Sequence, residues 1–150
     1  TPEGSVAKER NLYPAFLEFV RASMEAVREA GARPRLAGVI YHVGENDMSF
    51  HPFRNEAAKR LGTTISSLRA DLGEPELPWF ISQQPPTDHE RVNSVDVVAD
   101  MAALAATDPH THHRLMTELP PQPKQLVFDT AGIVGMGEIW ADWVVETEKD

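Results

Sequence analysis

The chain has 150 residues, no cysteine, and a formal net charge of −9 from 14 basic and 23 acidic side chains. The missing thiols exclude disulfide bonds, cysteine-ligated zinc and thiol catalysis. The acidic balance argues against nucleic acid or an anionic membrane as a partner, and no apolar run approaches the length of a membrane span. A chain of this length buries a substantial core, and we expect residues 1–150 to form a single domain.

Hydrophobic periodicity predicts helices and strands that alternate along the chain. Apolar side chains recur at three- and four-residue steps in segments that we expect to be helices: residues 12–30, 53–72, 91–106, and a last helix that begins near Thr130 with Asp129 as its cap. Short apolar runs predict strands at residues 36–43, 79–81, 114–117 and 125–128. Alternating strands and helices predict an α/β fold, a three-layer sandwich around a short, mostly parallel sheet.

The segment after the first predicted strand carries the polar groups best suited to chemistry. Gly44, Glu45, Asn46 and Asp47 follow the apolar run directly, and ligands of parallel sheets bind beyond the carboxyl ends of the strands. Glycine permits a tight turn, and the Asn46 amide can face a developing oxyanion. The alternative is a polar turn in which the side chains satisfy local backbone groups.

Histidine and tryptophan side chains gather in two other places. His110, His112 and His113 are metal-ligand types packed closely together, but zinc sites usually draw ligands from separate elements, so we expect a solvated loop and no metal site. Trp140 and Trp143 lie at helical spacing on the last predicted helix, where packing against the sheet is favoured over a platform for sugar binding.

The residues around position 44 resemble a family of esterases. Gly-Glu-Asn-Asp at residues 44–47 is similar to the Gly-x-Asn-Asp block of the SGNH hydrolases. The longer stretch at 40–47 is similar to the Trp-His-Gln-Gly-Glu-Ser-Asp segment of the sialate O-acetylesterase-like carbohydrate esterases. Residues 68–80 resemble the family's Leu-Arg-x-Asp-Leu-Gly … Leu-Pro-Phe stretch, and residues 128–141 its Phe-Asp-x-Ala-Gly … Gly … Ala stretch.

This resemblance implies an SGNH-hydrolase-like fold and the hydrolysis of a carboxylic ester of the acetylated-carbohydrate type, with no cofactor. Under it, Asn46 and the backbone of Gly44 assist the oxyanion, while Glu45 and Asp47 orient their neighbours through hydrogen bonds. His42 then lines the substrate pocket or supports it.

Two parts of the family's machinery have no counterpart here. No segment resembles the N-terminal Gly-x-Ser block that carries the nucleophile. The position of the family's catalytic histidine is Val127, and that of the aspartate three residues earlier is Lys124. The chain is then either the C-terminal part of a complete domain, which leaves Val127 unexplained, or a relative that kept the fold and lost the triad. In the second case it acts as a non-catalytic carbohydrate- or partner-binding module; a displaced base is a third alternative.

The missing serine block also has a structural consequence. Residues 1–11 carry only two apolar side chains, Val6 and Ala7, and do not predict the strand that would hold the serine. We therefore expect the predicted strand at 36–43 to have an unpaired flank. An unpaired edge is normally covered, here by a partner in a homo-oligomer, by a segment from another chain, by a missing N-terminal segment, or by the helix at 12–30.

Overall fold

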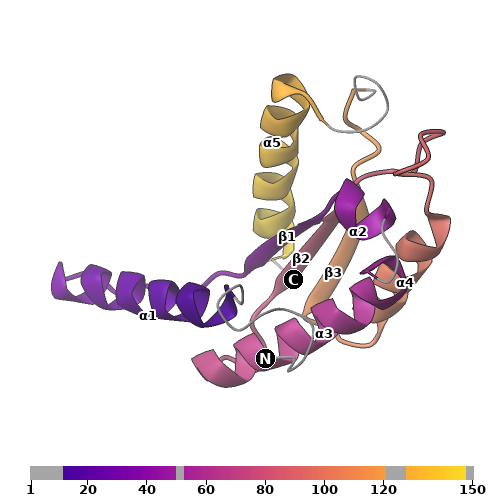
Figure 1. Ribbon diagram of the computed structural model, residues 1–150. Coiled ribbons are helices and arrows are strands. Elements are labelled where there is room, and N and C mark those ends of the chain that lie inside the picture. The colour runs from indigo at the N-terminus through magenta and orange to yellow at the C-terminus, as the bar shows by residue number, and fades with distance from the viewer. Residues whose placement is uncertain (1–11, 50–52, 121–127, 148–150) are drawn as a thin grey trace.

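Helices and strands alternate along the chain as the sequence predicts (Figure 1). The computed structural model describes residues 12–49, 53–120 and 128–147. In this part of the chain the elements are, in order, α1 (Tyr13–Glu29), β1 (Val39–Val43), α2 (Glu45–Ser49), α3 (Phe53–Leu72), β2 (Trp79–Gln83), α4 (Val95–Ala106), β3 (Thr111–Leu115) and α5 (Thr130–Thr147).

The strands of the described part form one parallel sheet in the order β1-β2-β3. Val39 pairs with Trp79, Trp79 pairs with Thr111, and the same register continues to the ends of the strands. α3 carries the connection from β1 to β2 and α4 the connection from β2 to β3, and both helices lie on the same face of the sheet (Figure 1). The predicted parallel α/β fold is confirmed.

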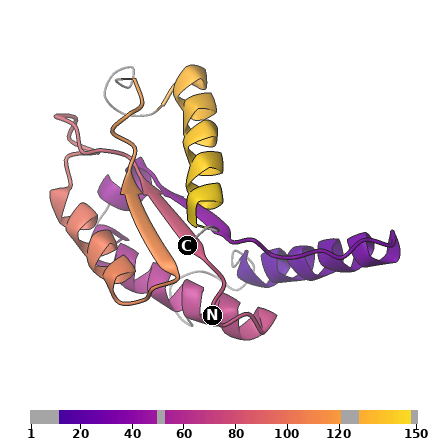
Figure 2. The same cartoon turned by 180° about the vertical axis from the view of Figure 1, so that it is seen from behind.

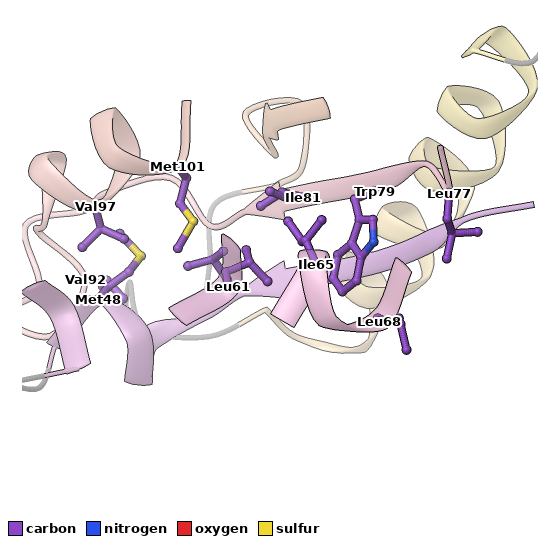
Figure 3. Close-up of a cluster of buried hydrophobic side chains, with 11 residues drawn as sticks. Met48, Leu61, Ile65, Leu68, Leu77, Trp79, Ile81, Val92, Val97 and Met101 are labelled. Carbon is purple, nitrogen blue, oxygen red and sulfur yellow. The ribbon is translucent and has the colours of Figure 1, made fainter. Parts of the chain in front are cut away.

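The face of the sheet toward α3 and α4 holds the main core (Figure 3). Side chains alternate along a strand, so Trp79 and Ile81 of β2 point into this core and Phe80 points to the other face. Each fully buried aliphatic or aromatic side chain stabilises the fold by about 1.5–3 kcal/mol. The buried cluster comprises Val43, Met48, Leu61, Ile65, Leu68, Leu77, Trp79, Ile81, Val92, Val97 and Met101.

The opposite face of the sheet is covered by α5, which completes the third layer (Figure 2). Trp143 packs edge-on against Phe80 with ring centroids 5.3 Å apart, and Trp140 lies 6.3 Å from the ring of His42. Both tryptophans therefore pack on the sheet, as the sequence predicts. The Asp129 carboxylate caps α5 by accepting a hydrogen bond from the backbone N–H of Gly132 at 2.8 Å.

Some predicted boundaries shift, each for a local reason. The helix expected from residue 91 begins at Val95, because residues 87–92 form a turn in which the Val92 N–H donates to His89 O at 2.9 Å. With that start, Val97 and Met101 face the core, whereas Val95 is 70% exposed. The strand expected at 114–117 lies at 111–115.

The ends of two predicted strands also differ. The first was expected at 36–43, but β1 begins at Val39, because β2 begins opposite it at Trp79, directly after Pro78. Of the strand expected at 125–128, residues 125–127 lie outside the described residues, and Phe128 belongs to no helix or strand.

α1 is a well-formed helix with little cover. Pro14 stands in its first turn, and Gly31, with φ of +84°, follows its end in the left-handed conformation that favours glycine. None of its residues is buried, and Phe19 is 70% exposed. The helix is attached at its start, where the Tyr13 hydroxyl donates to Asp71 Oδ2 of α3 at 2.6 Å.

Residues 68–73, on which part of the resemblance rests, close the end of the sheet opposite the predicted site. Arg69 donates to Leu77 O at 3.0 Å and to His110 O at 3.0 Å, and it forms an ion pair with Asp108. These contacts hold α3 to the segments that enter β2 and β3. Gly73, with φ of +71°, ends α3 in the left-handed conformation that favours glycine. This motif therefore has a structural role.

Candidate functional site

The residues predicted to carry chemistry follow β1 at its carboxyl end. Gly44 leaves the strand, and Glu45, Asn46 and Asp47 form the first turn of α2, where the predicted alternative was a polar turn. Carboxylates in a first helical turn are favoured by the exposed N–H groups there. At Gly44 the backbone is not left-handed and an added Cβ would meet no heavy atom within 4 Å, so neither conformation nor packing requires glycine.

Asp47 is a partly buried carboxylate with a side-chain hydrogen-bond partner. The Tyr41 hydroxyl donates to its Oδ2 over 3.4 Å. Burial raises the pKa of Asp47 from its ordinary value, although the hydrogen bond from Tyr41 opposes the change. Burial, together with the charge of Asp47, raises the pKa of Tyr41 to about 12, so the phenol stays a donor across the physiological range. The two side chains line a small cavity of about 210 Å³ together with Ala57, Arg60, Leu61 and Thr64.

Glu45 and Asn46 differ in their surroundings. Asn46 is exposed, and Glu45 is partly buried. The charge of Glu45 raises the pKa of Asp47 and opposes the lowering of the pKa of His42, so Glu45 is coupled to both groups. None of the contacts described in the structure tests the proposed oxyanion role of Asn46, which stays a prediction.

His42 points to the other face of the sheet, beneath α5. Its Nδ1 lies 2.9 Å from Ser82 Oγ, and its ring lies 6.0 Å from that of Phe128. Burial lowers the pKa of His42. The Ser82 hydroxyl also lies 3.5 Å from the Tyr41 carbonyl, and the tautomer of the His42 ring decides whether Nδ1 or Oγ is the donor between the two side chains. The structure therefore separates His42 from the Tyr41–Asp47 pair by the thickness of the sheet.

Ser82 and His42 are the residue types of a nucleophile and its base, but a substrate cannot reach the Ser82 hydroxyl. Ser82 lies in the middle strand and is completely buried, so the carbonyl carbon of an ester cannot reach its hydroxyl. Ser49 Oγ is also buried, and no partner contacts it in the described part of the chain. Lys124 and Val127 lie outside the described residues.

A larger cavity, which the sequence did not predict, opens at the same edge of the sheet. It has a volume of about 720 Å³ and is formed by the segments that follow β2 and β3, and by Phe128 before α5. We call it the edge cavity. Its lining residues are Pro85, Pro86, Thr87, Asp88, Asn93, Val95, Met116, Thr117, Leu119, Pro120 and Phe128. The available signal was the pair of prolines at 85 and 86, a few residues after the strand predicted at 79–81, which marks a loop but not a cavity.

Two hydrogen bonds join residues next to the edge cavity to Val43 and Met48, the residues on either side of 44–47. The backbone N–H of Gln84, the residue before the cavity's first proline, donates to Val43 O at 3.2 Å. The Ser94 hydroxyl, next to Asn93 of the cavity, donates to Met48 O at the end of α2. The polar turn and the edge cavity are therefore neighbours at the carboxyl edge of the sheet.

The histidine cluster does not form a solvated loop. His112 and His113 are adjacent in β3 and point to opposite faces, so they cannot share one metal ion. The His112 ring stacks on Phe80 at 5.4 Å, and His113 Nε2 lies 2.8 Å from Gln83 Oε1. Within residues 12–49, 53–120 and 128–147, no three His, Cys, Asp or Glu side chains are grouped as metal ligands would be.

Comparison with known proteins agrees with this architecture. A solved X-ray structure of a protein from Arabidopsis thaliana superimposes with a TM-score of 0.71 at 19% sequence identity, which shows a shared fold. The match covers 93% of this chain and 54% of that one, so the chain spans about half the length of the solved structure. No curated protein matches the sequence significantly. Among the described residues, no helix has the length and apolar character needed to cross a membrane.

The sequence itself matches a family model over nearly its whole length. The model is described as carbohydrate esterase, sialic acid-specific acetylesterase, and it matches residues 4–146. The polar turn after β1 and the motif at 68–73, both identified from the sequence, lie inside this match. The chain therefore belongs to the carbohydrate esterase family of sialic acid-specific acetylesterases.

Proposed function

We propose that this chain takes part in the hydrolysis of an O-acetyl ester on a carbohydrate, with the sugar bound in the edge cavity. The observation that carries the proposal is the position of that cavity beside residues 44–47. Its volume of about 720 Å³ lies in the range of about 300–1,000 Å³ typical of small-molecule sites. Asp88 and Asn93 offer hydrogen-bonding groups to sugar hydroxyls, and Phe128 offers an apolar surface to a ring face.

The acetyl group would then lie toward the start of α2. Asn46 and the Gly44 N–H are our candidates to stabilise the oxyanion that forms as the ester carbonyl is attacked. Asp47, held by Tyr41, positions the turn, and Glu45 adds negative charge next to it. His42, which lies with Ser82 on the opposite face of the sheet, has a supporting role away from the ester.

The nucleophile of the reaction is not among these groups. Because Ser82 is completely buried, we propose that the 150-residue chain alone is a weak esterase. Sites that lose a triad member keep a residual rate enhancement of about 10³–10⁴ over water. The second candidate function is a non-catalytic carbohydrate-binding module, which is favoured by Val127 and Lys124 at the positions of the family's histidine and aspartate.

A combined measurement of binding and turnover tests the proposal. Acetate release is followed with 4-nitrophenyl acetate and with O-acetylated sialic acid, and a fluorophosphonate probe reports any activated serine. Binding of the same acetylated sugar is followed by chemical-shift changes. Asp88→Asn, in the edge cavity, is compared with Asp142→Asn on the exposed surface of α5, a chemically matched control.

The outcomes separate the two functions. We expect weak turnover, no fluorophosphonate label, and sugar binding that Asp88→Asn weakens and Asp142→Asn leaves unchanged. Fast turnover that disappears in Ser49→Ala or Ser82→Ala would contradict the weak-esterase proposal. If the chain neither binds the acetylated sugar nor hydrolyses either ester, the edge cavity is not the proposed sugar site.

A further inference from the structure

Two apolar residues that line the edge cavity lie next to the first turns of α5. Leu119 follows β3 and Phe128 directly precedes α5, and both side chains are partly buried. α5 begins at the same end of the sheet as the segments that follow β2 and β3 (Figure 1). The charged and amide side chains of the lining, Asp88 and Asn93, belong to the segment after β2. The start of α5 can therefore control the apolar part of the cavity separately from these polar groups.

α5 faces these two side chains with glycine. A Cβ on Gly132 would lie 3.1 Å from Phe128 Cδ1, and a Cβ on Gly135 would lie 3.1 Å from Leu119 Cδ2. Residues three apart on a helix are neighbours on one face, so Phe128 and Leu119 lie side by side along α5. Neither glycine has a positive φ. Packing against the cavity lining, rather than backbone conformation, is therefore what favours glycine at these two positions.

Contacts on several sides fix the position of the Phe128 ring. The side chain lies over the buried Gly132, where a Cβ would come within 3.1–3.4 Å of three of its atoms. Its ring centroid lies 6.0 Å from that of His42. The adjoining backbone is held by Asp129, whose carboxylate accepts the hydrogen bond from the Gly132 N–H. A ring that is already held in place loses little conformational freedom when a ligand packs on it.

We propose that Phe128 determines the specificity of the edge cavity by packing on the face of a pyranose ring, and that Gly132 is the residue that positions it. The inference rests on the proposed function and names the ligand class of the same site, a cyclic sugar rather than an acyclic acetylated polyol. A pyranose presents C–H groups on its faces and hydroxyl groups around its edge. Phe128 packs on such a face, while Asp88 and Asn93 form hydrogen bonds at the edge.

Binding measurements on the 150-residue chain test the role of Phe128. The ligands are a monoacetylated methyl glucopyranoside and a monoacetylated sorbitol, which has similar hydroxyl groups but no ring. We expect the unchanged chain to bind the glucopyranoside more tightly. Phe128→Leu stays apolar but lacks the aromatic ring, and it should weaken binding of the glucopyranoside by about two- to tenfold while leaving binding of the sorbitol ester nearly unchanged. Phe128→Tyr, which keeps the aromatic ring, should retain the preference.

A pair of glycine variants tests the positioning role of Gly132. Gly137 lies in the same helix, is exposed, and has no heavy atom within 4 Å of an added Cβ, so Gly137→Ala is the matched control. Both substitutions change helix propensity alike. Gly132→Ala requires Phe128 to move by a few tenths of an ångström. We expect it to reduce the preference for the glucopyranoside and to shift the NMR signals of the nearby His42 ring protons, whereas Gly137→Ala should do neither.

The outcomes distinguish this inference from the proposed function. If the unchanged chain binds neither ligand, the proposed function fails and the role of Phe128 fails with it. If the chain binds the two ligands equally, or if Phe128→Leu weakens both alike, the edge cavity stays the ligand site but the inference is wrong. Equal effects of Gly132→Ala and Gly137→Ala on the ligand preference and on the His42 signals would refute the positioning role of Gly132.

Discussion

Replacing Arg69 with methionine tests whether its guanidinium holds the amino-terminal end of the sheet closed. The side chain is 12% exposed, donates to Leu77 O and His110 O, and pairs with Asp108. A hydrogen bond contributes about 0.5–1.5 kcal/mol between neutral groups and about 1.5–3 kcal/mol when one group is charged. Methionine keeps the packing of the aliphatic stem, so we expect the free energy of unfolding to fall by about 3 kcal/mol.

Urea denaturation followed by tryptophan fluorescence measures this loss, because Trp79 lies in the core next to the affected end of the sheet. Arg28→Met is the matched control: Arg28 pairs with Glu25 on the open surface of α1, and we expect its loss to stay within about 0.5 kcal/mol. A loss below about 1 kcal/mol for Arg69→Met, or equal losses for both variants, would refute the proposed role of Arg69 in holding this end of the sheet closed.

The pH dependence gives the same experiment a second arm. Burial alone would raise the pKa of Asp108, but hydrogen bonds from Thr111 and Arg69 hold it at about 2, below the ordinary value of 3.8. As pH falls, the Asp108 carboxylate is therefore protonated in the unfolded chain at a higher pH than in the folded chain. The stability that Asp108 contributes is present above about pH 4 and is lost between about pH 4 and 2. In Arg69→Met the pKa should return toward 3.8, and the loss across this window should shrink.

Three further substitutions, one of them with a control variant, have defined outcomes. Gly38→Ala should lower the free energy of unfolding in urea by about 1–3 kcal/mol, because its Cβ would lie 2.8 Å from the buried ring of Phe80. The control Gly44→Ala, with open space around it, should lower it by under about 1 kcal/mol. Similar losses for the two variants would contradict the packing argument. Asp129→Ala should cost about 1 kcal/mol through the lost cap of α5, seen as a lower melting temperature, and no change would show the cap to be dispensable. Burial lowers the pKa of His42, so the free energy of unfolding should fall as pH drops below about 6.5. His42→Gln should reduce this dependence of stability on pH. An unchanged dependence would show that another group causes it.

The long helices of the fold could be predicted because the side chains that repeat at the helical period are also the ones that pack in the core. α3 spans residues 53–72 as expected, since Leu61, Ile65 and Leu68 repeat at the helical period and all reach the core. α1 shows the limit of this reasoning. Its period identifies which side chains share a face, but whether anything covers that face depends on a partner that periodicity cannot indicate. The periodicity correctly places Phe19 on the apolar side of this helix, but it cannot show that the side chain is exposed.

The candidate site was predictable only where it is contiguous in sequence. Residues 44–47 stand out because an apolar strand ends there abruptly. α2 is too short to show a period, and Met48 enters the core through contacts with residues distant in sequence. The pairing of His42 with Ser82 depends on the register of β1 and β2, and the edge cavity on three separate segments. Arrangements of this kind follow from topology rather than from any local motif.

The all-parallel connectivity of the sheet also bears on how the chain folds. In the described part of the chain each strand pair joins residues separated by a complete crossover, so none of these strands can form a β-hairpin first and template the rest. The helices can form early from local contacts, but the strands align only after two long loops have closed, and topologies of this kind fold slowly. Until then, β2, which becomes buried along its whole length, is exposed to other chains. Recovery on refolding should therefore depend on protein concentration more strongly than the modest size of the chain suggests.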